Sequence, residues 1–317
     1  LGATSAAVAT TGAGVYAPGN ANAYKVTGAT NANYLVTLVD GTLTIDKAHL
    51  AVAADNLGKT YGEANPTLTA TITGFKNGEL LGTSGVSGSA GLSTTATAST
   101  GVGGVTITAA QGGLTASNYD FTTFTNGTLT IGQRPITLTA GSNAAGTRLY
   151  GDATNPAVGV TPNATATGTG IATGAGDTLG SAFGALGATS AAVATTGAGV
   201  YAPGNANAYK VTGATNANYA VTLVDGTLTI DKAHLTVSAD SLTKTYGEAN
   251  PTLTATITGF KNSEVLGTSG VGGAALLNTA ATVSTGVSAV PITSAQGTLT
   301  AANYDFTPFN PGALTIN

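Results

Sequence analysis

Thr-Leu-Thr-Ala-Thr-Ile-Thr, residues 67–73, alternates polar and apolar side chains without a break. Leu68, Ala70 and Ile72 therefore share one face of an extended chain, with the threonines on the other. Threonine suits the outer face because its branched β-carbon fits the pleat and its hydroxyl stays hydrated. This segment predicts a strand with one buried face. The same alternation recurs at Leu50, Val52 and Ala54, at Val105, Ile107 and Ala109, and at Leu129 and Ile131.

A turn signal, Lys-Thr-Tyr-Gly-Glu-Ala-Asn-Pro, precedes this strand at residues 59–66 and recurs letter for letter at residues 244–251. Its glycine can adopt a positive φ, its asparagine can bond nearby backbone, and its proline disfavours helix at the preceding residue. A variant that is one residue longer, Arg-Leu-Tyr-Gly-Asp-Ala-Thr-Asn-Pro, occupies residues 148–156. We interpret the motif as a structural turn. The predicted turn residues are Tyr61, Gly62, Glu63, Asn65 and Pro66, then Tyr150, Gly151, Asp152, Asn155 and Pro156, and finally Tyr246, Gly247, Glu248, Asn250 and Pro251.

Two further expectations concern this turn. Tyr61 should pack its ring under the loop and find a hydrogen-bond partner for its hydroxyl at the rim. The functional alternative is a weak cation site formed by Glu63 and the side chain of Asn65. One carboxylate provides poorly for calcium, which takes roughly 6 to 8 oxygen ligands.

The chain repeats with a period of 185 residues. Residues 1–50 match residues 186–235 at 49 of 50 positions, and the sole difference is Leu35 against Ala220. Two repeat types alternate within the period, each closing on Asn-Tyr followed by a Gly-Thr/Ala-Leu-Thr-Ile strand. The predicted domains are 1–45 (the C-terminal part of a longer repeat), 46–131 (a shorter repeat), 132–230 (a longer repeat) and 231–317 (a shorter repeat).

The predicted fold class is all-β. Glycine and proline interrupt the chain about every 8 to 12 residues, and no helical apolar spacing is sustained. This pattern predicts tandem small β-sandwich domains of the immunoglobulin-like kind, with β-grasp-like repeats as the alternative. Only two residues, Asp46 and Lys47, separate the first predicted domain from the next strand, so we expect a semi-rigid rod. A two-domain period should advance roughly 60 to 80 Å.

Composition narrows the classes of partner. The chain has 10 Lys and Arg against 14 Asp and Glu, and its cations are scattered singly, so we expect no nucleic-acid partner. Cys, Met and Trp are absent, which suits an oxidising extracellular setting. No apolar run approaches the roughly 20 residues that span a bilayer, so we expect no membrane span in this segment.

No residue pattern predicts catalysis, a cofactor or a metal centre, and we expect the protein not to be an enzyme. Residues 53–60 resemble a phosphate-binding loop but lack its first glycine and a following helix. His49 and His234 stand alone at one position of the period, whereas metal and triad chemistry need several converging groups. They are expected on an outer face or at a junction between repeats.

The Tyr-Gly-acid and Asn-Pro turn, the Asn-Tyr strand and the closing Gly-Thr-Leu-Thr-Ile resemble the MBG and YDG repeat domains of very large bacterial surface proteins. Many such proteins look like filamentous-haemagglutinin-type adhesins exported by two-partner secretion. The resemblance covers essentially the whole chain. It implies an extracellular stalk module on the bacterial cell surface and brings no catalytic residues.

Three functions are therefore compared. The leading hypothesis is a structural stalk segment of an adhesin or fibre, extending a distal binding element and contacting the neighbouring repeats of its own chain. The second is a subunit of an extracellular filament or biofilm matrix in which identical chains pair laterally, since low surface charge opposes packing only weakly. The third is a module that binds a carbohydrate or protein ligand of the host or matrix, with Tyr16, Tyr24, Tyr201 and Tyr209 as the candidate stacking residues.

Overall fold

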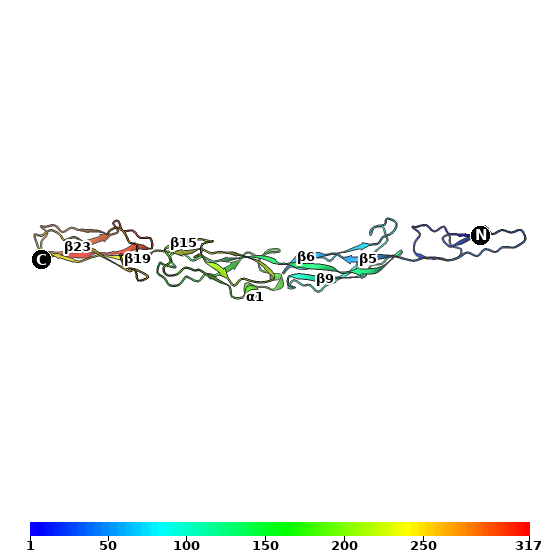
Figure 1. The fold of residues 1–317 in the computed structure, drawn as a ribbon, viewed down its shortest axis with the longest axis horizontal. Helices are drawn as coiled ribbons and strands as arrows, with labels where there is room; N and C mark the ends of the chain where they lie inside the picture. The colour runs from blue at the N-terminus through cyan, green and yellow to red at the C-terminus, as the bar shows by residue number, and fades with distance from the viewer. The chain divides into compact units, whose positions relative to one another are not determined.

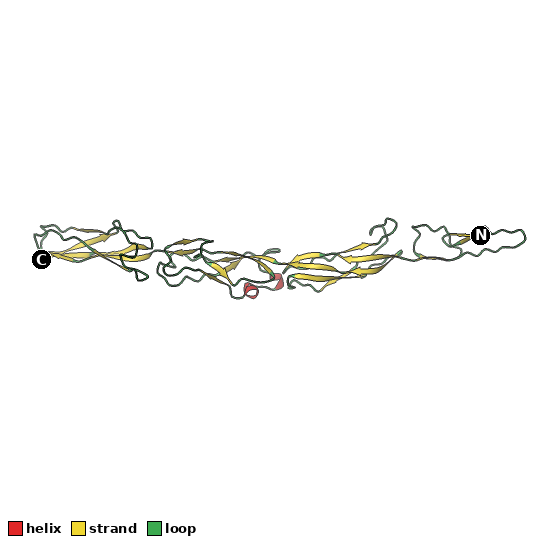
Figure 2. Cartoon of the chain, in the orientation of Figure 1, coloured by secondary structure: helices red, strands yellow, loops and turns green.

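A computed structural model describes all 317 residues as strands joined by turns and loops. Helix is confined to two short segments, the 3-10 helix η1 (Thr173–Ala175) and α1 (Leu179–Phe183) (Figure 2). The prediction of an all-β chain of tandem domains is confirmed.

The first shorter repeat contains two sheets (Figure 1). One has the strand order β10-β5-β7 and the other the order β6-β11-β9-β8. Its strands are β5 (Ala48–Ala54), β6 (Leu57–Thr60), β7 (Ala70–Thr73), β8 (Gly91–Thr94), β9 (Gly103–Ala110), β10 (Tyr119–Thr125) and β11 (Gly127–Gly132). The opening pair β5 and β6 runs parallel to the closing pair β10 and β11, while the remaining neighbours are antiparallel.

The predicted alternation accounts for the core of this repeat. Leu50 and Val52 of β5 are fully buried together with Ile107 of β9 and Leu129 of β11. Burying each such side chain stabilises the fold by about 1.5–3 kcal/mol relative to leaving it in water. The segment 67–73 alternates as expected, although its ladder begins only at Ala70.

The second shorter repeat copies this order strand for strand. Its sheets have the orders β21-β19-β24 and β20-β25-β23-β22. The strands are β19 (Ala233–Ala239), β20 (Leu242–Lys244), β21 (Ala255–Thr258), β22 (Leu276–Thr279), β23 (Ser288–Ala295), β24 (Tyr304–Asn310) and β25 (Gly312–Ile316). Ile292, Leu314 and Ile316 form its core with Ala239 and Ala281.

The longer repeat is built from shorter strands. They are β12 (Arg134–Ala140), β13 (Val160–Pro162), β14 (Gly187–Thr189), β15 (Gly199–Tyr201), β16 (Lys210–Thr212), β17 (Tyr219–Val224) and β18 (Leu228–Ile230). β14 pairs with β16 and β15 with β18. Residues 1–45 form the same two antiparallel pairs, β1 (Gly2–Thr4) with β3 (Lys25–Thr27) and β2 (Gly14–Tyr16) with β4 (Leu43–Ile45).

The chain comprises two compact units. The first contains residues 1–134, 165–178 and 217–220, and the second contains residues 135–164, 179–216 and 221–317. Both units take residues from the predicted longer repeat, 132–230. Segments 165–178 and 217–220 belong to the first unit because they pack against the turn at Tyr61 and the side chain of Arg134.

Candidate functional site

The three predicted turns share one backbone geometry. Gly62, Gly151 and Gly247 have φ values of 83°, 91° and 88°, a region that other residues enter only with strain. The acidic residue that follows each glycine closes the turn by accepting a backbone N–H three residues earlier. These bonds are Thr60 to Glu63 at 3.3 Å, Leu149 to Asp152 at 2.7 Å and Thr245 to Glu248 at 3.1 Å.

The cation that opens the motif is held inside the turn. Lys59 Nζ donates to Asn65 Oδ1 at 2.8 Å and to the carbonyl oxygens of Glu63 and Thr97 at 3.1 and 2.6 Å. Lys244 makes the equivalent three bonds. In the longer type, Arg148 donates to Asn155 Oδ1 and to the carbonyl of Val193. Burial lowers the pKa of Lys59, and the nearby Glu63 carboxylate opposes the shift.

The asparagine of the motif ties the turn to a neighbouring loop. Asn65 Nδ2 donates to the carbonyl of Ala96 at 2.6 Å, and Asn250 does the same to Ala281 at 2.7 Å. Because the Oδ1 of Asn65 already accepts the Lys59 ammonium, that side chain holds a cation supplied by the chain itself. The prolines follow directly, and the carbonyl of Pro156 accepts the hydroxyl of Tyr209 at 2.8 Å. The bonds of the motif's Lys or Arg inside the turn were not predicted from the sequence.

Tyr61 packs against the longer repeat that follows it, where its ring meets Tyr219 edge-on at a centroid distance of 5.7 Å. Only 6% of Tyr61 is exposed. Burial raises the pKa of its hydroxyl, and the charge of Asp177 and a hydrogen bond to that carboxylate raise it further. Tyr219 donates to the same carboxylate at 2.6 Å. The ring was expected to pack under its own loop, but its aromatic partner comes from the following repeat.

Tyr150 repeats this arrangement against the second shorter repeat. Its ring lies 5.4 Å from that of Tyr304 at an interplanar angle of 85°. The two hydroxyls donate to the two oxygens of one carboxylate, Tyr150 to Glu264 Oε1 at 2.5 Å and Tyr304 to Glu264 Oε2 at 2.7 Å. Burial and then the bond to Glu264 raise the pKa of Tyr304 to about 12. We call such an acid and tyrosine pair the socket and the Tyr-Gly turn the plug.

The space around the glycine of each plug differs between the plugs that contact a following repeat and the one that does not. A Cβ added to Gly62 would lie 2.4 Å from the Cβ of Ala172, and one added to Gly151 would lie 2.4 Å from the Cβ of Lys261. At Gly247 nothing lies within 4 Å, and Tyr246 beside it is 58% exposed. Where a plug is seated, glycine is therefore required both by its positive φ and by the lack of space for a Cβ.

Two more contacts join the plugs to the repeats that receive them. Arg134, 4% exposed, donates to the carbonyl oxygens of Gly170 and Thr169, and also to that of Tyr61 at 3.3 Å. In three of the four Asn-Tyr pairs, the asparagine accepts a backbone N–H from the preceding repeat. These acceptors are Asn118 for Ala13 at 2.9 Å, Asn218 for Val102 at 3.0 Å and Asn303 for Ala198 at 3.0 Å. The recurrence of Asn-Tyr at each closing was the sequence signal for these contacts.

The two histidines and the segment that resembles a phosphate-binding loop, residues 53–60, lie on strands of the shorter repeats. His49 and His234 are exposed on β5 and β19, and each Nδ1 lies 2.5 Å from a carboxylate oxygen, of Asp120 and Asp305 respectively. Residues 53–60 form the end of β5 and all of β6, with no helix. Nowhere in the chain do three or more His, Cys, Asp or Glu side chains gather as metal ligands would.

The four tyrosines considered for ligand stacking differ in burial. Tyr209 is 1% exposed, whereas Tyr24, its equivalent 185 residues earlier, is 42% exposed. Tyr16 and Tyr201 are half-buried, and their hydroxyls donate to the carbonyls of Gly12 and Gly197 at 2.6 and 2.7 Å.

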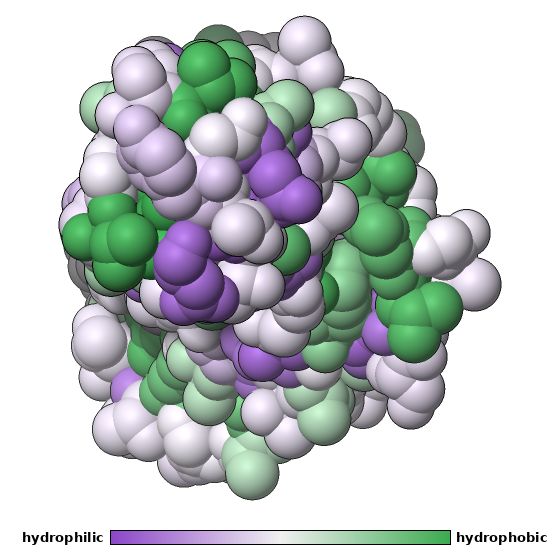
Figure 3. Space-filling view, turned by 90° about the vertical axis from the view of Figure 1, so that its left-hand side faces the viewer, coloured by the Kyte–Doolittle hydropathy of each residue, from purple (hydrophilic) through white to green (hydrophobic).

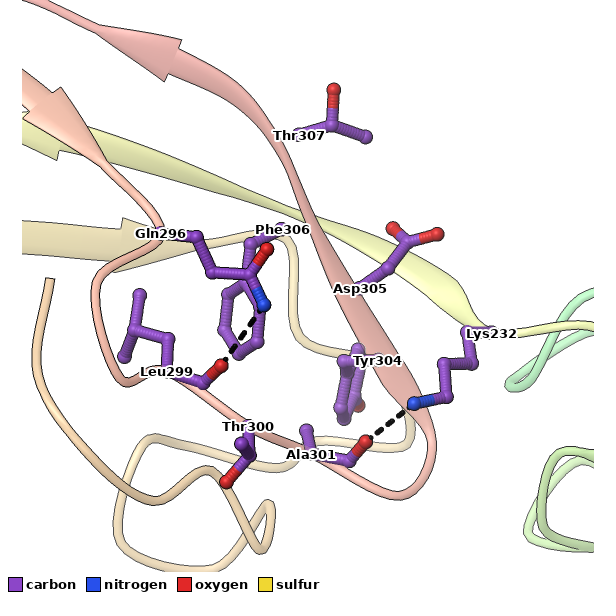
Figure 4. A pocket seen from close by; sticks show the side chains of 9 residues that line it. All are labelled: Lys232, Gln296, Leu299, Thr300, Ala301, Tyr304, Asp305, Phe306 and Thr307. Carbon is purple, nitrogen blue, oxygen red and sulfur yellow. Dashed lines mark hydrogen bonds between the residues drawn. The ribbon is translucent and has the colours of Figure 1, made fainter.

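A cavity of about 340 Å³ lies in the second shorter repeat beside β24 (Figure 4). Two of its polar side chains bond to backbone carbonyls, Lys232 to that of Ala301 at 2.7 Å and Gln296 to that of Leu299 at 3.1 Å. The surface in Figure 3 mixes pale, weakly polar residues with separate apolar and hydrophilic ones. The chain contains no helix with the length and apolar character needed to span a membrane.

A family model described as MBG domain (YGX type) matches the chain at residues 50–130 and 235–315. The two matched segments coincide with the two shorter repeats and together make up just over half of the chain. A comparison with curated proteins found no similar sequence.

Proposed function

Because the chain belongs to the MBG domain family of the YGX type, we propose that it is a structural stalk segment of an extracellular bacterial adhesin or fibre. In this role the repeats hold a distal binding element away from the cell surface. The proposal includes no catalytic step, since the recurring polar residues bond to turns and to neighbouring repeats.

The observation that supports this role most strongly is the seating of the plugs at Tyr61 and Tyr150 in the repeats that follow them. Tyr61 and Tyr150 are 6% and 3% exposed, and each shares a carboxylate with a tyrosine of the repeat that receives it. Edge-to-face aromatic pairs contribute about 0.5–1.5 kcal/mol beyond their area burial, and bonds to charged groups about 1.5–3 kcal/mol. Junctions of this kind resist swivelling, as a load-transmitting stalk requires.

Small-angle X-ray scattering combined with light scattering over a concentration series tests the proposal. We expect monomer mass throughout and the scattering of an extended particle. Tyr150→Ala should broaden the distribution of interatomic distances because it loosens a seated plug. Tyr246→Ala, at the exposed plug, is the matched control and should leave the curve unchanged. A compact or freely jointed wild-type chain would exclude a stalk.

A second candidate is the laterally associating filament subunit, and one surface feature favours it. Leu80 and Leu81 are 70% and 51% exposed, and their equivalents Val265 and Leu266 are 60% and 51% exposed. Apolar pairs repeated at the period of the chain would give a regular lateral contact. If the mass rises with concentration in the same series, and replacing these four residues with serine abolishes the rise, the filament replaces the passive stalk.

A further inference from the structure

The first shorter repeat carries a socket formed in the same way as the one that Tyr150 fills. The Tyr119 hydroxyl donates to Glu79 Oε2 at 2.6 Å and accepts the backbone N–H of Lys76 at 3.0 Å. The filled socket has corresponding distances of 2.7 Å from Tyr304 to Glu264 and 2.9 Å from Lys261 to Tyr304. The acceptor geometry therefore exists without a plug in place.

A cavity of about 110 Å³ lies where the plug would sit. Asp46, Lys76, Glu79, Asn118 and Tyr119 are among the residues that line it. In the filled socket, the carbonyl of Asp231 accepts the N–H of Tyr150 at 2.8 Å, and that of Ala194 accepts the N–H of Gly151 at 3.2 Å. Their equivalents, Asp46 and Ala9, border the cavity.

The segment that carries the seated plug is also bound by residues 186–231. The carbonyl of Arg148 accepts the N–H of Asp231 at 2.9 Å, and Asn155 Nδ2 donates to the carbonyl of Ala192 at 2.9 Å. Tyr209 donates to Pro156, as described above. Residues 1–45 have the same sequence apart from Leu35, so they present the same donors and acceptors.

We propose that the socket of Glu79 and Tyr119, together with residues 1–45, is a binding site for the opening segment of a longer repeat, with its Tyr-Gly-Asp plug in the cavity. The occupant has the sequence of residues 132–164. Binding should order residues 34–39 as a strand, as in β17, and bury Tyr24 and Tyr34, which are 42% and 74% exposed. This inference rests on the proposed function, because it identifies what makes a stalk junction specific.

The test uses the full chain and a fluorescein-labelled peptide with the sequence of residues 132–164, followed by fluorescence anisotropy. We expect saturable binding with one peptide per chain. Peptide carrying Gly151→Ala should bind at least about tenfold more weakly, because its new Cβ would collide with Lys76 as it would with Lys261. Peptide carrying Tyr150→Phe should lose about tenfold, since it cannot donate to Glu79.

Two matched variants of the chain locate the site. Glu79→Gln should weaken peptide binding about tenfold, whereas Glu264→Gln, in the socket that is already filled, should leave it unchanged. Equal effects of the two variants, or equal binding of wild-type and Gly151→Ala peptides, would overturn the proposal.

A fusion protein tests the same site in case the free peptide is too disordered to bind. The sequence of residues 132–185 is placed directly before Leu1, and hydrogen exchange is measured at residues 35–39. Protection equal to that of residues 220–224 supports the site even if the free peptide binds weakly. Exchange as fast as in the unfused chain overturns it. Neither result depends on whether the chain scatters as a monomeric rod, so failure of the stalk proposal is recognised separately.

Discussion

Residues 1–45 and 186–230 have almost the same sequence but different structures. Both form two short strand pairs and one ion pair, Lys25 to Asp40 at 2.8 Å and Lys210 to Asp225 at 2.7 Å. Only the second copy contains a strand like β17, which pairs with β12. Tyr34 is 74% exposed, whereas its equivalent, Tyr219, is 2% exposed.

The comparison of the two copies distinguishes the structure that this segment forms by itself from the structure that it forms in contact with the opening segment of the longer repeat. The retained strand pairs and the ion pair join residues at most 31 positions apart, and their loop-closure cost is correspondingly modest. Burial of the tyrosines and formation of β17 require the opening segment of the repeat. The same contrast holds for the plugs, seated at Tyr61 and Tyr150 and exposed at Tyr246.

The largest expected effect is a difference in the loss of stability between Tyr209→Ala and Tyr24→Ala. Tyr209 is buried and bonded to Pro156, so its loss should cost about 3–5 kcal/mol. Tyr24 occupies the same sequence position, and its loss should cost about 1 kcal/mol or less because the ring is already partly in water. Native-state hydrogen exchange at Lys210–Thr212 and at Lys25–Thr27 measures the two losses. Equal losses would mean that burial does not distinguish the copies.

The next effect compares two glycines within one compact unit. Gly151→Ala should destabilise it by about 2–4 kcal/mol, from a strained positive φ and a collision with Lys261. Gly247→Ala has the same φ strain with open space around it and should cost about 1–2 kcal/mol. Urea unfolding of both variants gives the difference. A larger loss at Gly247 would contradict the assignment of Gly151 to a seated plug.

The third prediction concerns alkaline pH. The pKa of Tyr304 is raised from 10.0 to about 12 in the folded chain, chiefly by burial. Its neutral form therefore contributes stability that is complete below pH 10 and is lost as the pH rises through about 12. Tyr304→Phe should remove this part of the pH dependence of the urea midpoint. Tyr246→Phe, at an exposed ring, should leave the dependence unchanged, and a response equal to that of Tyr304→Phe would refute the argument.

The smallest effect belongs to Leu35→Ala, which makes the two copies identical. Leu35 is fully exposed, so the change should alter the free energy of unfolding by less than about 0.5 kcal/mol. A measurable increase in hydrogen-exchange protection at Tyr24 or Tyr34 would indicate that this substitution, and not binding of an opening segment, causes the difference between the copies.

The sequence predicted where the strands lie better than it predicted which strands pair with one another. Alternation at Leu50, Val52 and Leu129 indicated which side chains are buried, because period-2 spacing is a local property. It carries no information on pairing, so the parallel alignment of β5 with β10 was not predicted. The turn at Tyr61 was recognised from its glycine and proline, whereas its contact with Tyr219 joins residues 158 positions apart. Asp177 lies in a stretch that the shorter repeats lack, and no motif indicated it.

The separation of plug and socket onto successive repeats also bears on how such a gene can change length. Unequal recombination between the nearly identical stretches 1–50 and 186–235 would remove or add one whole period of 185 residues. Every product would still join a longer repeat to a shorter one, so each plug would meet the socket type that it already fits. The number of repeats can therefore change without the need for a new kind of junction.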